Sequence, residues 1–210
     1  MTAKAKYHTI VILDRSGSMG GVRDTTIKGV NEYLQTLNKS DGDMVLTFST
    51  FSSEGIEYLY DKIAIADTKP LEASQYDPSG MTPLLDAIGT VVNKVEKQYA
   101  DKKKKPIINV MIITDGLENC SKEHTTKTIK DLLEAKEKEG WGFNYLGANQ
   151  DAWSAAGSIG IRKDAAVNYT TSEMVGTFKA VALNTSDARR AHSSAVRWSG
   201  EKLEIPDDQK

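Results

Sequence analysis

The sequence contains a single cysteine, Cys120, so no disulfide can form within the chain. It also lacks any apolar run approaching the roughly 20 residues that a membrane-spanning helix needs. Neither sign of charge dominates, because 27 Lys and Arg against 29 Asp and Glu give a formal net charge of −2. A nucleic-acid surface built on bulk charge needs a strong basic excess. We therefore expect neither a membrane nor a nucleic acid among the partners.

The cysteine content also bears on the compartment. One cysteine fits a reducing environment, or a domain with little need of covalent cross-links. The apolar stretch at residues 7–13 is too short and too β-branched for a signal peptide, and no small-residue cleavage site follows it. We expect a cytoplasmic protein. Hydrophobic residues make up 39% of the chain and charged residues 27%, a composition typical of a folded domain with a sizeable core.

Apolar strand-like runs alternate with helical spacings along the chain. Residues 59–66 alternate in polarity and carry charges, as an edge strand does, while the other runs are continuous and predict strands buried on both faces. This alternation predicts a three-layer α/β/α doubly wound sandwich, mostly parallel, with one antiparallel edge strand at 59–66. The predicted strands are 7–13, 44–51, 59–66, 107–114, 141–147 and 166–169, and the predicted helices include those at 152–158 and 172–191.

The chain shows no internal repeat, linker or boundary, so we expect a single domain over residues 1–198. Residues 199–210 form a polar tail that we expect to fray. The pattern weakens after about residue 160, and no motif covers that part.

Oxygen-bearing side chains follow two of the predicted strands. Asp14-Arg15-Ser16-Gly17-Ser18 comes directly after the first strand, and Thr114-Asp115-Gly116 ends the strongest one. Ligands of open α/β sheets bind beyond the carboxyl ends of the strands, where the strand order reverses. If these two strands are neighbours there, Asp14 and Asp115 face one crevice. Thr82, at the start of a predicted helix, could reach the same crevice.

The residue types at this crevice indicate a particular metal chemistry. Two carboxylates and three hydroxyls are hard oxygen donors, and neither His nor Cys belongs to the set. That combination favours Mg²⁺, with Mn²⁺ or Ca²⁺ as alternatives, over zinc. In Asp-x-Ser-x-Ser every second side chain points the same way through a tight turn, and Gly17 is expected to let that turn bend sharply.

These motifs resemble the metal-ion-dependent adhesion site of the von Willebrand factor A family. That site reads Asp-x-Ser-x-Ser, then a Thr, then an Asp, and the chain is closest in type to bacterial and phage stand-alone members. The resemblance implies that the serines and the threonine ligate the metal and that the aspartates ligate it or hold its waters. It also implies that an Asp or Glu of a partner protein completes the metal shell. The matching residues are Asp14, Ser16, Ser18, Thr82 and Asp115.

The sequence leaves other interpretations open. Asp residues commonly end strands and form turns, and Thr82 could simply cap a helix. Ser16–Gly20 approaches the Gly-x-Ser-x-Gly motif of serine hydrolases, in which Ser18, Asp115 and His192 would act in that order. Position 16 is Ser rather than Gly, however, and no oxyanion motif is evident. A third possibility is an accessory subunit of an ATPase complex.

Of these, the sequence favours a metal-dependent protein-binding module that is not an enzyme. Its specificity would come from the loops around the site, near residues 19–23, 52–57, 76–81 and 117–124.

Overall fold

A computed structural model describes residues 6–39, 43–148 and 152–190 of the chain. Within these ranges, strands and helices alternate as the hydrophobic pattern predicts, with short 3-10 turns between some of them. The strands are β1 (Tyr7–Asp14), β2 (Met44–Ser52), β3 (Gly55–Ala64), β4 (Ile107–Thr114), β5 (Gly142–Ala148) and β6 (Ala166–Tyr169). The helices are α1 (Arg23–Asn38), α2 (Leu84–Tyr99), α3 (Thr126–Lys138), α4 (Ala152–Ser158) and α5 (Met174–Arg190).

The strands form one sheet in the order β3-β2-β1-β4-β5-β6. Strand β3 pairs antiparallel with β2, and all other pairs are parallel. After β1 the chain goes to β2 on one side, and it later returns to β4 on the other side. The strand order therefore reverses between β1 and β4, in the middle of the sheet.

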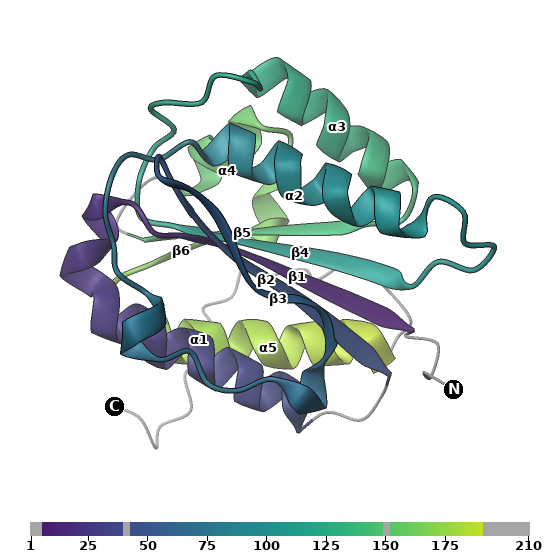
Figure 1. Cartoon of the computed structure of the whole chain (residues 1–210), viewed down its shortest axis with the longest axis horizontal. Helices are drawn as coiled ribbons and strands as arrows, with labels where there is room; N and C mark the ends of the chain where they lie inside the picture. Colours follow the sequence, from purple (N-terminus) through teal and green to yellow (C-terminus); the bar gives the residue numbers. More distant parts are fainter. Residues whose placement is uncertain (1–5, 40–42, 149–151, 191–210) are drawn as a thin grey trace.

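Helices cover both faces of the sheet, α2, α3 and α4 on one and α1 with α5 on the other (Figure 1). The central strands are buried on both sides, and successive residues enter opposite cores. In β1, Ile10 and Ile12 belong to the core under α2, while Val11 and Leu13 belong to the core under α1. Helices α1 and α5 pack closely because Gly29 has no side chain where the Phe178 ring lies.

The predicted α/β/α sandwich with one antiparallel edge strand is confirmed. The helix at 152–158 and the strand at 166–169 have the predicted bounds. The edge strand was predicted too late in the chain, since it occupies residues 55–64, and residues 65–67 form a 3-10 turn. None of the helices in the described ranges combines the length and apolar composition that a membrane crossing requires. The predicted tail at 199–210 lies outside the described residues.

A buried histidine in β1 makes the stability of the fold depend on pH. His8 is fully buried, with Nε2 2.8 Å from the Thr47 hydroxyl and Nδ1 3.0 Å from the Tyr99 hydroxyl. Burial, together with the charge of nearby Lys62, lowers the pKa of His8 to about 3, while Asp61 acts in the opposite direction. His8 is therefore neutral in the folded protein and titrates near 6.5 in the unfolded chain.

We expect the free energy of unfolding to fall as the pH drops below 6.5, because the unfolded state then binds a proton that the folded state excludes. The contribution of His8 approaches about 1.4 kcal/mol per pH unit. The His8→Gln variant keeps a hydrogen-bonding side chain but should lose this slope. Urea unfolding of both proteins between about pH 7 and pH 5 measures the difference, and other titrating groups cancel in the comparison. Equal slopes for the two proteins would contradict this assignment.

Candidate metal centre

The two predicted carboxylates lie side by side at the carboxyl edge of the sheet. Asp14 is the last residue of β1, and Asp115 immediately follows β4, the strand paired with β1. The strand order reverses between these two strands. The condition on which the sequence argument depended, that these two strands are neighbours at the switch point, is met.

The loop after β1 orients three of the predicted residues in the same direction. The Ser16 backbone N–H donates to Asp14 Oδ1 at 2.7 Å, and the Ser16 and Ser18 hydroxyl oxygens lie 3.1 Å apart. The left-handed conformation at this edge belongs to Gly80, with φ of 75°, and the bend expected at Gly17 does not use a positive φ. The Gly17 N–H donates to the Gly80 carbonyl at 3.0 Å, which joins the loop after β1 to the segment that precedes Thr82.

Two short hydrogen bonds connect this loop to the end of β4. Ser18 Oγ donates to Asp115 Oδ1 at 2.6 Å, and Thr114 Oγ1 donates to Asp14 Oδ2 at 2.6 Å. The sequence interpretation named Thr114 only within the segment Thr114-Asp115-Gly116 and gave it no role, although its position at the end of the strand was a usable signal. Side-chain oxygens at the carboxyl ends of β1 and β4, and in the residues that follow them, are thus in mutual contact.

Thr82 brings a third segment to the same point. A Cβ added to Gly116 would lie 3.3 Å from Thr82 Oγ1, 3.4 Å from Ser18 Oγ and 3.9 Å from Asp14 Oδ2. Three oxygens from three segments therefore surround the space above Gly116, which exists because glycine carries no side chain. We call this space the oxygen cradle, formed by Asp14, Ser18, Thr82 and Gly116.

The electrostatics of the site favour a cation. Asp14 is fully buried, and burial raises the pKa of its carboxyl group, as does the charge of Asp115, although hydrogen bonds from Thr114 and Ser16 oppose the shift. Burial also raises the pKa of Asp115, against a hydrogen bond from Ser18. A buried carboxylate without a positive partner is costly. The described part of the chain places no ion pair on either residue.

The donor set fits a hard divalent cation. Across residues 6–39, 43–148 and 152–190 there is no cluster of three or more His, Cys, Asp or Glu side chains that could hold a metal. The candidate centre has two carboxylates, and its remaining oxygens are hydroxyls. Mg²⁺ accepts such oxygen donors and retains several waters, which suits a site with few protein carboxylates.

Tyr76 makes a hydrogen bond to the end of β1 that the sequence did not predict. Its buried hydroxyl donates to the Asp14 carbonyl oxygen at 2.6 Å, and burial raises the pKa of Tyr76. Farther along this loop, the Ser79 N–H donates to the Arg15 carbonyl at 2.9 Å. A loop tyrosine gives no local signal of such a role, because the contact joins residues far apart in the sequence.

The first turn of α2 is capped by the loop that follows Asp115, and not by Thr82. Glu118 Oε2 accepts from the Leu85 N–H at 2.9 Å, and Glu118 Oε1 accepts from the N–H groups of Cys120 and Ser121. Burial acts to raise the pKa of Glu118, but these hydrogen bonds outweigh it and lower the pKa. The hydroxyl of Thr82 makes no cap to α2, so it is available to the cradle.

Replacing Glu118 should loosen this loop. In Glu118→Gln, the new amide NH₂ cannot accept from donors that the carboxylate satisfies, so we expect a loss of about 1.5–3 kcal/mol in the free energy of unfolding. Hydrogen exchange should accelerate at the Leu85, Cys120 and Ser121 amides. Glu123→Gln, at an exposed position in the same loop, serves as the control and should leave these amides unchanged. Unaltered exchange in Glu118→Gln would show that the carboxylate does not hold the loop.

Ser18, which would be the nucleophile of a serine hydrolase, contacts a carboxylate in this structure. Its hydroxyl donates directly to the Asp115 carboxylate rather than to an imidazole. Of the histidines in the described ranges, His8 lies between Thr47 and Tyr99, and His124 packs against Gly89 of α2. His192 lies outside the described residues.

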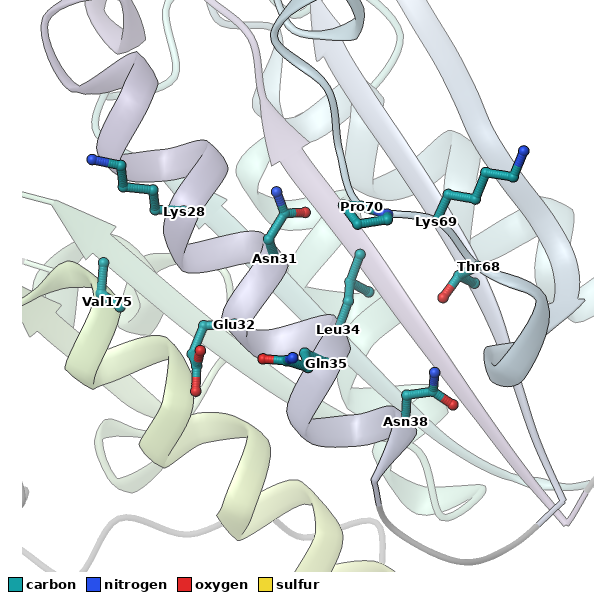
Figure 2. Close-up of a pocket in the computed structure, with 10 residues that line it drawn as sticks. All are labelled: Lys28, Asn31, Glu32, Leu34, Gln35, Asn38, Thr68, Lys69, Pro70 and Val175. Atoms are coloured by element: carbon teal, nitrogen blue, oxygen red, sulfur yellow. The ribbon is translucent and has the colours of Figure 1, made fainter.

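A shallow groove of about 580 Å³ lies away from this centre, on the flank of α1 (Figure 2). It runs between α1 and residues 68–70, and Val175 of α5 lies at one side. Asn31 in this groove already binds backbone, donating to the Leu71 carbonyl at 3.0 Å and accepting from the Leu71 N–H at 2.7 Å. None of the residues that line the groove belongs to the oxygen cradle.

The fold is shared with solved structures, although no family model and no curated protein matches the sequence. The von Willebrand factor type A protein from Catenulispora acidiphila superposes with a TM-score of 0.60 at 16% identity, over 88% of this chain and 43% of that chain. The vWF domain of the pili tip protein Mfa5 from Porphyromonas gingivalis gives a TM-score of 0.61 at 9% identity, over 89% and 97%. The chain has the von Willebrand factor A fold.

A third neighbour with this fold is the manganese-loaded TRAP protein of Plasmodium vivax. It superposes with a TM-score of 0.59 at 18% identity, over 83% of this chain and 73% of that chain. The von Willebrand factor A fold described here spans less than half the length of several neighbours, the Catenulispora protein among them.

Proposed function

We propose that this chain is a protein-binding module that holds a divalent cation, Mg²⁺ or Mn²⁺, and uses it to bind a carboxylate of a partner protein. The observation that carries the proposal is the convergence of oxygens from three segments of the chain on the space above Gly116. The proposed metal-holding residues are Asp14, Ser16, Ser18, Thr82 and Asp115.

The division of roles follows from burial and contacts. Asp14 is buried, and hydrogen bonds from Ser16 and Thr114 hold its carboxylate in place. It would therefore bind the metal, or the waters of the metal, from the buried side of the site. Ser18 is exposed, so a metal that it holds could be reached from solvent. A bound Mg²⁺ supplies a Lewis-acidic position that exchanges water for an outside carboxylate. Neutral hydroxyl ligands leave more of the ion's charge for that carboxylate than further protein carboxylates would.

The comparison with TRAP supports the choice of metal, because that neighbour with the same fold was crystallised in a manganese-loaded form. Manganese also provides a convenient probe, since it is paramagnetic and takes the same oxygen donors as Mg²⁺.

Water proton relaxation tests this proposal. Mn²⁺ bound to the chelator-treated protein should enhance relaxation through its exchangeable waters, and added acetate should reduce the enhancement by displacing one of them. Acetamide has nearly the same shape without the charge and should have no effect. If acetate left the relaxation enhancement of bound Mn²⁺ unchanged, the result would contradict binding of a carboxylate by the metal. A partner complex that survives chelation would instead favour the accessory-subunit alternative.

A further inference from the structure

Two large apolar side chains are exposed directly beside the candidate metal centre. Leu117 is 66% exposed and Met81 is 54% exposed, the highest values among large hydrophobic residues in the described part of the chain. Met81 directly precedes Thr82, and Leu117 directly follows Gly116. Each is therefore one residue away from the oxygen cradle.

The segments that carry these side chains are hydrogen-bonded to their neighbours. Met81 and Ser53 are joined twice, by the Met81 N–H donating to Ser53 Oγ at 2.9 Å and the Ser53 N–H donating to the Met81 carbonyl at 2.9 Å. Two hydrogen bonds also join Thr82 and Asn119. The Thr82 N–H donates to Asn119 Oδ1 at 2.9 Å, and the Asn119 N–H donates to the Thr82 carbonyl at 3.2 Å. The loop that contains Met81 and the loop that contains Leu117 are thus hydrogen-bonded to each other beside the cradle.

Other exposed apolar residues in the described ranges have a different setting. The Trp153 indole N–H donates to the Ala166 carbonyl at 3.2 Å, and Lys163 lies 4.8 Å from the centre of its ring. Ile63 lies on the edge strand β3, and Leu183 lies on helix α5. Exposed apolar groups on a fixed, polar rim are typical of interaction sites, because a partner can bury them at little entropic cost.

We propose that the partner segment bound here carries its acidic residue beside a bulky apolar side chain, which packs against Met81 and Leu117. This inference rests on the proposed function, because the acidic residue reaches the site through the metal. The acidic group alone would give a weak preference shared by many proteins. The apolar neighbour adds selectivity, and its burial is expected to tighten binding about tenfold.

Selection from a phage-displayed random peptide library tests the inference. The full chain is immobilised with Mg²⁺, and bound phage are eluted with EDTA. The same selection is run on the Met81→Ser/Leu117→Ser double variant and on Ile63→Ser, a control at an exposed apolar position on β3. Mn²⁺ binding by each variant verifies that the site is intact.

In the pool from the unmodified chain, we expect acidic residues to be enriched and to have a bulky apolar neighbour about ten times more often than in the double-variant pool. The Ile63→Ser pool should match that of the unmodified chain. Enrichment of acidic residues with no apolar bias, or with the same bias in the double variant, would overturn this inference and leave the proposed function standing. A pool with no acidic enrichment would overturn the proposed function itself.

Discussion

The Asp14→Asn variant should lose the thermal stabilisation that Mg²⁺ gives to the unmodified protein. Metal bound only by the folded state contributes about 2.7 kcal/mol at a concentration one hundred times Kd. For a domain of this size, that corresponds to a rise of about 5–10 °C in Tm. Asparagine removes the anionic oxygen that anchors the ion, so the Tm of the variant should not respond to Mg²⁺.

The same variant should be no less stable than the unmodified protein when both are free of metal. An amide at position 14 can still accept from the Ser16 N–H. The Thr114 hydroxyl can turn its single proton to the Gly116 carbonyl, 3.1 Å away, and accept from the new NH₂ group. The cost of burying a carboxylate disappears at the same time. Asp101→Asn, at an exposed position, is the matched control and should keep the full response to Mg²⁺. A metal-induced rise in Tm that persists in Asp14→Asn would contradict the assignment.

Gly116→Ala should block the metal without removing any ligand. The added methyl group would lie 3.3 Å from Thr82 Oγ1 and 3.4 Å from Ser18 Oγ, within the oxygen cradle. An ion could bind only after the surrounding loops shifted. Overpacking of this kind costs about 1–3 kcal/mol, so we expect the Kd for Mn²⁺ to rise about 10- to 100-fold.

Electron paramagnetic resonance of free Mn²⁺ measures this effect. Gly20→Ala is the control, because an added Cβ at Gly20 has no neighbour within 4 Å. The control should bind Mn²⁺ as the unmodified protein does. Equal affinity of Gly116→Ala and Gly20→Ala would mean that the ion does not occupy the cradle.

The sequence predicted the residues of this site that follow buried strands. Asp14 ends β1, and Ser16 and Ser18 follow it in strict alternation, with their two hydroxyl oxygens 3.1 Å apart. Asp115 was placed correctly because the apolar run of β4 marks the end of a central strand. The positions of these residues at the strand ends could be predicted because burial on both faces leaves a strong signal in the sequence.

The features that were missed depend on contacts between distant segments. Glu118 caps α2 and Tyr76 supports Asp14, and neither belongs to a motif that reports the contact. The start of β3 was predicted four residues late, since Gly55–Tyr58 is held by backbone pairing with β2 while most of the strand is exposed. An exposed edge strand has a weak hydrophobic pattern, so its bounds are set by its partner strand.

Calorimetric titration of Mg²⁺ into the chelator-treated full chain tests the central claim most directly. The claim is that the oxygens of Asp14, Ser16, Ser18, Thr82 and Asp115 form one divalent-cation site. The result we predict is saturable binding of one ion per chain. Titration with no saturable binding of Mg²⁺ or of Mn²⁺ would contradict the claim.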